Sequence, residues 1–461
     1  MLQTAQNRVL DPSVTARKVF FDLFDGQAAP CELEAAARYL GAQLEQAQHL
    51  DSDLPQDVND LHAWMEAGVE RVGQSYREYL DERQAGSARR YFKNKSHAIF
   101  FLKSVAPTKM VDGAWLYGLL EHWRDPRFSA LIQTYLEELG EGLPSKNHVV
   151  LYKKLLATQG CERWDDLSDE HYVQGAIQLA LALNADRFLP EIIGFNLGYE
   201  QLPLHLLITA YELKELGIDP YYFTLHITVD NADSGHAKKA VDSIFDAMPR
   251  VGNTHDFMRR VYNGYKLNLV GADTHSVIEE FDLKREMIAI FSRKGAIGRY
   301  AHSDYRQVSG RTVNQWLGES NDTGALIAAM ESEGWFKRNQ DPQNSRFWKL
   351  IHSEKAKMFG VFSAYEQQVI YDWIAGDWAD ASNAKVALSF EAKQRLKSAP
   401  HASASEAQSD FDSELRALEE DISASQNEQE SMSKLIDLMS PSNHHSAPGL
   451  MATRIFNELI T

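Results

Sequence analysis

The stretch YFTLHITVDNADSGH, residues 222–236, places two histidines and two aspartates directly behind an aromatic run. In a helix with 100° per residue, Asp230 lies about 40° from His226, and Asp233 lies about 20° away on the other side. These three side chains therefore share one face. His236 lies about 60° from Asp233 but about 120° from Asp230. We expect a helix here that carries a cluster of carboxylate and imidazole groups.

This cluster points to a metal site. Carboxylates and imidazoles are costly to bury unless a cation offsets the loss of hydration. Mixed ligands of this kind without sulfur suit iron or manganese. Direct coordination by both Asp230 and His236 would require local unwinding, which Asn231 or Gly235 would permit. The alternative is a cluster with a purely structural role.

Helical periodicity extends outward from this stretch over most of the chain. Apolar residues recur at spacings of three and four, and breaks rich in Gly and Pro separate the helical patterns. We therefore predict an all-α fold. It divides into an N-terminal helical extension (1–90), a metal-binding helical core (91–285), a C-terminal helical extension (286–379), and a linker with a helical tail (380–461).

The tail begins with a Ser- and Ala-rich linker near residues 398–405 and continues with amphipathic segments. A tail of this kind packs on its own core or on a second copy in a homodimer. His444 and His445 lie in a stretch rich in Ser and Pro, and we expect them in a solvated loop.

Composition excludes several classes of function. The chain has 461 residues and a formal charge of -18, which disfavours nucleic acid and anionic lipid surfaces as partners. No stretch reaches the roughly 18 to 20 apolar residues of a membrane span, and the N-terminus lacks a secretory signal. We therefore expect a cytoplasmic protein without a membrane partner. Cys31 and Cys161 form no zinc or CxxC pattern, and we expect two buried thiols.

Three motifs occur in a definite order. EELGEG (137–142) is followed by His148, LGYE (197–200) comes next, and the segment 222–236 closes the series. In this order and spacing they resemble the haem-oxygenase-like diiron oxidases and oxygenases, also called iron-containing redox enzymes. KMFGVF (357–362) resembles a C-terminal motif of longer members. The resemblance covers roughly residues 95 to 375.

The resemblance implies an up-and-down helical bundle of haem-oxygenase shape. Such a bundle binds no haem but one or two irons, cycling between Fe(II) and Fe(III), with O2 as co-substrate. The implied ligands are Glu138 and His148 from one helix, Glu200 from a second, and His226, Asp230 and His236 from a third.

The chain departs from the family pattern in two places. Five residues separate Asp230 from His236 where the family has two, so either an insertion bulges the helix or Asp233 replaces Asp230. Many members also carry a first-helix carboxylate, for which Asp112 is the candidate by position and Glu121 a poorer one.

Two further residues belong to this prediction. Glu141, seven residues before His148, is a rival for Glu138. Tyr222, one turn before His226, is expected to orient the imidazole from outside the ligand set.

We therefore predict an iron-dependent oxidoreductase with a small amino-acid-derived or carboxylic-acid substrate. N-oxygenation or oxidative C–C cleavage in secondary metabolism is the expected reaction, with desaturation as a further option. No Rossmann or flavin motif is visible, so an external electron donor is one option for the reductant. The alternative is a catalytically inactive helical binding or scaffold protein on the same fold. Thiamin-degrading chemistry would need a cysteine near the ligand motifs, and neither cysteine lies there.

Overall fold

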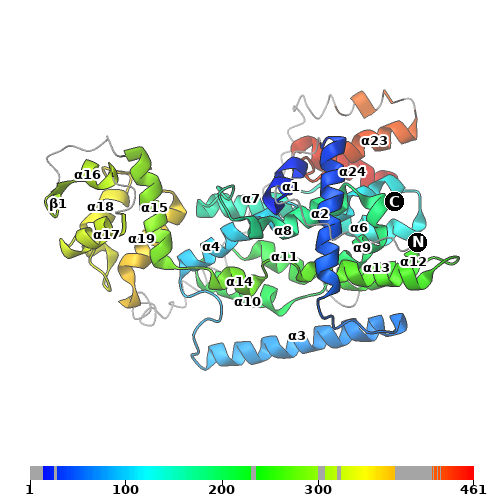
Figure 1. Ribbon diagram of the computed structural model, residues 1–461, viewed down its shortest axis with the longest axis horizontal. Coiled ribbons are helices and arrows are strands. Elements are labelled where there is room, and N and C mark those ends of the chain that lie inside the picture. The colour runs from blue at the N-terminus through cyan, green and yellow to red at the C-terminus, as the bar shows by residue number, and fades with distance from the viewer. Residues whose placement is uncertain are drawn as a thin grey trace, which may run out of the picture.

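The computed structural model describes residues 14–24, 28–229, 235–298, 307–318, 323–378, 418, 420–422, 424–425 and 427–460. Helices dominate it, as predicted for an all-α protein of haem-oxygenase-like fold (Figure 1). The described strands are a two-residue hairpin, β1 (Gln307–Val308) and β2 (Arg311–Thr312), in which Gln307 pairs with Thr312. Within the described residues, no helix has both the length and the apolar character needed to cross a bilayer.

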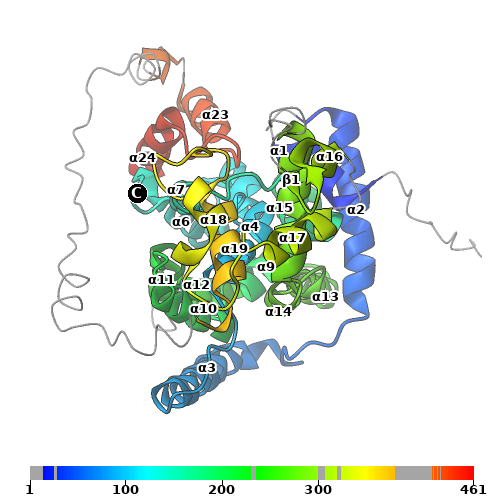
Figure 2. The ribbon, with the colours of Figure 1, turned by 90° about the vertical axis from the view of Figure 1, so that its left-hand side faces the viewer.

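Within the predicted N-terminal segment, residues 1–90, the structure describes three α-helices, as the periodicity predicts. They are α1 (Ala16–Phe24), α2 (Pro30–Gln48) and α3 (Leu61–Gln84), with the 3-10 helix η1 (Val58–Asp60) before α3. The apolar face of α1 is buried because Phe20 stacks on Phe24 and meets Trp164 and Tyr172 edge to face. The helix α3 runs along one side of the molecule (Figures 1 and 2).

The core follows as a series of shorter helices. They are α4 (Lys95–Ser104), α5 (Ala106–Lys109), η2 (Ala114–His122), η3 (Pro126–Phe128), α6 (Ser129–Glu138), η4 (Gly140–Gly142), α7 (His148–Gln159), η5 (Asp169–Tyr172), α8 (Val173–Ala182), α9 (Ala185–Tyr199), α10 (Leu204–Glu215), α11 (Tyr221–Val229), α12 (His236–Ala247), α13 (Thr254–Lys266), η6 (Leu267–Leu269) and α14 (Thr274–Glu279).

The helices α9 and α13 approach closely through glycines. A Cβ added at Gly194 would lie 1.8 Å from the Val261 carbonyl oxygen, and one at Gly264 would lie 2.1 Å from that of Glu191. The same pair of helices is joined by an ion pair between Arg260 and Glu191, at 2.6 Å. Glycines allow this approach because they lack a side chain. The contact holds α9 in place, and Glu200 follows directly at its C-terminal end.

The C-terminal extension packs on the core through α4. It contains α15 (Leu283–Gly298), α16 (Val313–Gly318), α17 (Thr323–Ser332), η7 (Pro342–Asn344), α18 (Arg346–Ile351) and α19 (Ala364–Ala375). Asp372 of α19 accepts a hydrogen bond of 2.8 Å from the Ser96 backbone N–H at the start of α4. The buried apolar side chains of the C-terminal extension form one hydrophobic cluster with those of α4, α7 and α10.

The described part of the tail, α23 (Glu428–Leu438) and α24 (Ala447–Ile460), packs on the chain's own core. The Tyr135 hydroxyl donates to the Met439 carbonyl at 2.7 Å, and Phe456 is fully buried. His444 is only 1% exposed, so the expected solvated loop is wrong at this residue. The stretch is polar in sequence, but docking of α24 encloses it.

The two cysteines differ in environment. Cys161 is buried, as predicted, whereas Cys31 near the start of α2 is exposed, which corrects the expectation of two buried thiols. Cys31 lies on the solvent-exposed side of the amphipathic helix α2. Which side of such a helix faces solvent depends on how the helix packs against the rest of the chain.

Candidate metal centre

Two groups of buried carboxylates and imidazoles meet inside the core and share Glu138. Cluster 1 comprises Asp112, Glu138, His148 and His226; cluster 2 comprises Glu138, Glu200 and His236. Within each cluster, one candidate ligand atom from every residue lies within 4.8 Å of the others. All six residues are at most 6% exposed.

A sharp turn brings Glu138 and His148 together. Glu138 is the last residue of α6, and three consecutive residues, Gly140, Glu141 and Gly142, then adopt positive φ values of 64°, 53° and 78°. Such values end a helix, and Gly adopts them without steric cost. His148 therefore begins a new helix, α7, and the expectation that one helix carries both residues is wrong.

A second break separates the two later histidines. The helix α11 carries His226 and ends at Val229, and α12 begins at His236 after Gly235 in an extended conformation. The single helix implied by the resemblance is therefore two helices. Asp230 and Asp233 lie outside the described residues, so the choice between them stays a prediction.

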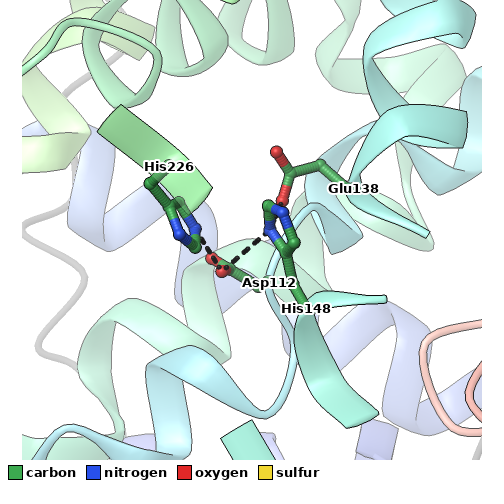
Figure 3. Close-up of side chains that lie close together, drawn as sticks. All are labelled: Asp112, Glu138, His148 and His226. Atoms are coloured by element: carbon green, nitrogen blue, oxygen red, sulfur yellow. Dashed lines mark hydrogen bonds and ion pairs between the residues drawn. The ribbon is translucent and has the colours of Figure 1, made fainter. Parts of the chain in front are cut away.

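Asp112 lies between the two imidazoles of cluster 1 (Figure 3). Its Oδ2 atom is 3.1 Å from His226 Nε2 and 3.6 Å from His148 Nδ1. Glu138 Oε2 lies 2.5 Å from His148 Nδ1. Gly113, at φ +78°, permits this approach because a Cβ there would lie 2.8 Å from the Glu138 Cβ. The structure thus places Asp112, the candidate first-helix carboxylate, inside the cluster.

The other oxygen of Glu138 faces cluster 2. Glu138 Oε1 lies 3.5 Å from His236 Nδ1, and Glu200 Oε2 lies 3.0 Å from the same nitrogen. His236 Nε2 donates to Glu137 Oε2 at 2.6 Å, and Lys239 in turn donates to Glu137. Because Nε2 is engaged by Glu137, Nδ1 is the nitrogen that faces the other two carboxylates. Glu138 therefore presents one oxygen to each cluster.

The pKa values of two residues in cluster 1 are shifted by the opposite charges that surround them. Burial lowers the pKa of His148, but Glu138 and Asp112 outweigh this effect and raise it to about 10. Burial raises the pKa of Asp112, yet Lys109 and the two imidazoles hold it well below its usual range. Both shifts arise because neighbouring groups of opposite charge stabilise the charged form of each residue.

Two buried polar atoms indicate that the donors are arranged for a cation. Glu138 Oε2 and His148 Nδ1 are close, but neither has a hydrogen-bond partner of suitable direction among the described residues. A buried polar atom without such a partner is costly in a folded protein. An ion bound by both atoms would satisfy them, and carboxylate with imidazole is a donor set that suits iron. The residues therefore fit a metal.

Tyr222 touches the cluster at two points. Its carbonyl accepts a hydrogen bond of 2.8 Å from His226 Nδ1, which leaves His226 Nε2 directed at Asp112. Its hydroxyl donates to Asp112 Oδ2 at 2.5 Å. A hydrogen bond to the far nitrogen fixes the orientation of a ligand imidazole. The structure thus places Tyr222 in contact with both His226 and Asp112, and its role in orienting a ligand imidazole stays a prediction.

Two rival residues do not reach the clusters. Glu141 is 40% exposed at its side chain and pairs with Lys146 at 3.4 Å. Glu121 is exposed on η2. The positive φ of Glu141 turns its side chain away from the interior.

Sequence reasoning missed several residues that support the site. Glu137 binds the far nitrogen of His236, and Tyr199 donates to Asp112 Oδ1 at 2.7 Å while Lys109 donates to Tyr199 at 2.9 Å. Their sequence signal was adjacency, because Glu137 and Tyr199 each precede a predicted ligand. The contact between Asn147 Nδ2 and His444 Nδ1, at 3.1 Å, joins positions far apart in the chain and had no such signal.

Comparison with known proteins agrees with this geometry. No curated protein and no solved structure matches the chain significantly. Residues 99–268 match a family described as iron-containing redox enzyme. This segment contains every residue of both clusters. The resemblance inferred from the sequence is thereby confirmed for residues 99–268, which match the model of the iron-containing redox enzyme family.

Proposed function

We propose that the chain is a non-haem diiron enzyme that activates O2. The observation that carries this proposal is the position of Glu138, which presents Oε2 to His148 and Oε1 to His236. Asp112, His148 and His226 would hold one ion with Glu138, and Glu200 and His236 would hold the other. Bound iron supplies the one-electron steps that O2 reduction requires.

The chain's own residues prepare the site for this task. Hard carboxylate oxygens favour the ferric state, and neutral imidazoles limit the total negative charge. The Tyr222 and Tyr199 hydroxyls donate to Asp112, and burial, followed by the Asp112 charge, raises both tyrosine pKa values well above the usual range. Both tyrosines therefore remain protonated donors that hold Asp112 in place.

The proposed substrate is a small amino-acid-derived or carboxylic-acid molecule, transformed by N-oxygenation or oxidative C–C cleavage in secondary metabolism. This assignment rests on the family resemblance. An external electron donor would supply any electrons that the substrate does not. We propose a cytoplasmic location because Cys31 and Cys161 are both free thiols, which suits a reducing compartment. The alternative of an inactive scaffold protein rested on the altered spacing after Asp230 and on the uncertain first-helix carboxylate. The second of these grounds is weakened, because Asp112 lies in cluster 1.

Anaerobic titration with Fe(II), followed by elemental analysis and Mössbauer spectroscopy, tests the proposal. The wild-type protein should retain two iron ions per chain that are magnetically coupled. Glu138→Gln should lose the coupling and retain fewer than two ions, since it weakens both clusters at once.

Glu141→Gln is the matched control, because Glu141 is close in sequence but outside both clusters. It should bind iron like the wild type. Iron-dependent O2 consumption measured on the same samples tests the activity separately. A folded wild-type protein that retains no iron would contradict the proposal, and so would a Glu138→Gln variant with an unchanged coupled pair.

A further inference from the structure

The C-terminal extension contains an apolar cavity of about 620 Å³. Its walls come from α15, α16, α17 and α18, the strand β1, and the segment 357–362, in the lobe at the left of Figure 1. Several of the lining side chains are buried from solvent: Phe291, Val308, Leu326, Met330, Phe347 and Phe362. No residue of cluster 1 or cluster 2 lines it. The cavity is therefore separate from the candidate metal centre.

The rim of the cavity carries apolar side chains that are unusually exposed. Ile297 is 85% exposed and Val361 is 40% exposed, and both line the cavity. Phe359, 59% exposed, lies next to this rim in the segment 357–362. Exposed apolar groups gathered at the opening of an apolar cavity typically mark a binding site, because a bound molecule removes them from water.

The described charged side chains that line the cavity are all positive. Among the described lining residues the charged ones are Lys294 and Lys357, and none is acidic. The whole chain has 65 acidic and 47 basic residues, so this lining does not follow the composition. Lys294 is paired with Glu366 at 2.8 Å and lies 5.6 Å from the centre of the Phe362 ring. Lys357 is exposed and is the cation available to a ligand.

We propose that this cavity binds an amphiphilic carboxylate, a small molecule with an aliphatic body and one anionic head group. The body occupies the space between Phe291, Met330 and Phe347, and the carboxylate faces Lys357 at the rim. The volume lies within the range of small-molecule pockets, roughly 300 to 1,000 Å³. This binding site is additional to the proposed iron chemistry and does not depend on it.

Dodecanoate is a suitable probe, with 1-dodecanol and dodecyltrimethylammonium as neutral and cationic molecules of equal chain length. Isothermal titration below the micellar concentration should give one dodecanoate per chain in the full-length protein. The alcohol and the cation should bind more weakly.

Three variants locate the site. Val313→Phe fills the cavity from a half-buried wall and should weaken dodecanoate binding at least about tenfold. Lys357→Gln removes the exposed cation and should weaken dodecanoate about two- to fivefold without changing dodecanol, in line with the strength of exposed ion pairs. Lys349→Gln, an exposed lysine of α18 outside the lining, should have no effect.

Several outcomes would overturn the proposal. Absence of dodecanoate binding to the wild type is one, and equal affinity for the cationic probe is another. Equal binding by Lys357→Gln and the wild type would remove the assigned head-group contact, even if Val313→Phe failed to fold. Sedimentation would assign the face to a second copy of the chain if the wild type were a dimer and Val313→Phe a monomer.

Discussion

The substitution Gly142→Ala tests how the tail supports the turn between Glu138 and His148. Gly142 has φ +78°, and an added Cβ would lie 2.3 Å from the Leu450 carbonyl oxygen on α24. The left-handed conformation costs a non-glycine residue about 1–2 kcal/mol. Overpacking against a backbone atom adds about 1–3 kcal/mol, because α24 must move. We expect a total loss of about 2–5 kcal/mol in the free energy of unfolding.

Gly217→Ala provides the matched control. Gly217 has φ +69°, but a Cβ there would meet nothing within 4 Å. Its expected cost is the backbone strain alone, about 1–2 kcal/mol. Urea unfolding followed by circular dichroism measures both losses, and limited proteolysis reports release of α24 in Gly142→Ala. Equal stability losses with an equally protected α24 would refute the reasoning.

Two further predictions concern buried histidines. Burial lowers the pKa of His97 to about 4. Between pH 6.5 and pH 4 the unfolded chain therefore binds more protons at this residue than the folded chain does. The free energy of unfolding should fall by roughly 2–4 kcal/mol as the pH drops through this window. Denaturation midpoints measured against pH should decline less steeply in His97→Gln than in the wild type. The control His49→Gln, which changes an exposed histidine, should keep the wild-type profile. Parallel profiles for all three proteins would contradict this prediction. His444→Ala should cost about 1–3 kcal/mol, because the buried Asn147 amide loses one of its two partners and keeps only the Leu139 carbonyl. His445→Ala should cost less, because the contact of His445 with Lys153 is exposed. Thermal unfolding of both alanine variants measures the difference, and an equal shift in the two would count against the Asn147 contact.

Helix class and the chemical type of the site followed from local patterns. Spacings of three and four predicted α1, α2 and α3, because a helix buries one face wherever it packs. The same reasoning failed for the segment 137–148, where Gly140 and Gly142 divide the expected helix. Both glycines are visible in the sequence, yet their φ values depend on the tight approach to Asn147 and Leu450.

Membership of the clusters was partly predictable. Glu138, His148, Glu200, His226 and His236 are brought together as the motif order predicted. Asp112 was a candidate by position alone, and its contact with His226 spans 114 positions. Glu141 was a rival on helical spacing, and the turn that carries it excludes it.

By itself the sequence determined that the chain is helical, that its central region carries a set of carboxylate and imidazole groups, and which family that region resembles. Periodicity and motif spacing are local properties, so they survive without knowledge of packing. Tertiary structure alone decided that Glu138 faces two clusters, that Asp112 completes one of them, and that the tail encloses His444. These contacts join residues distant in sequence, and their geometry depends on how whole helices pack against one another.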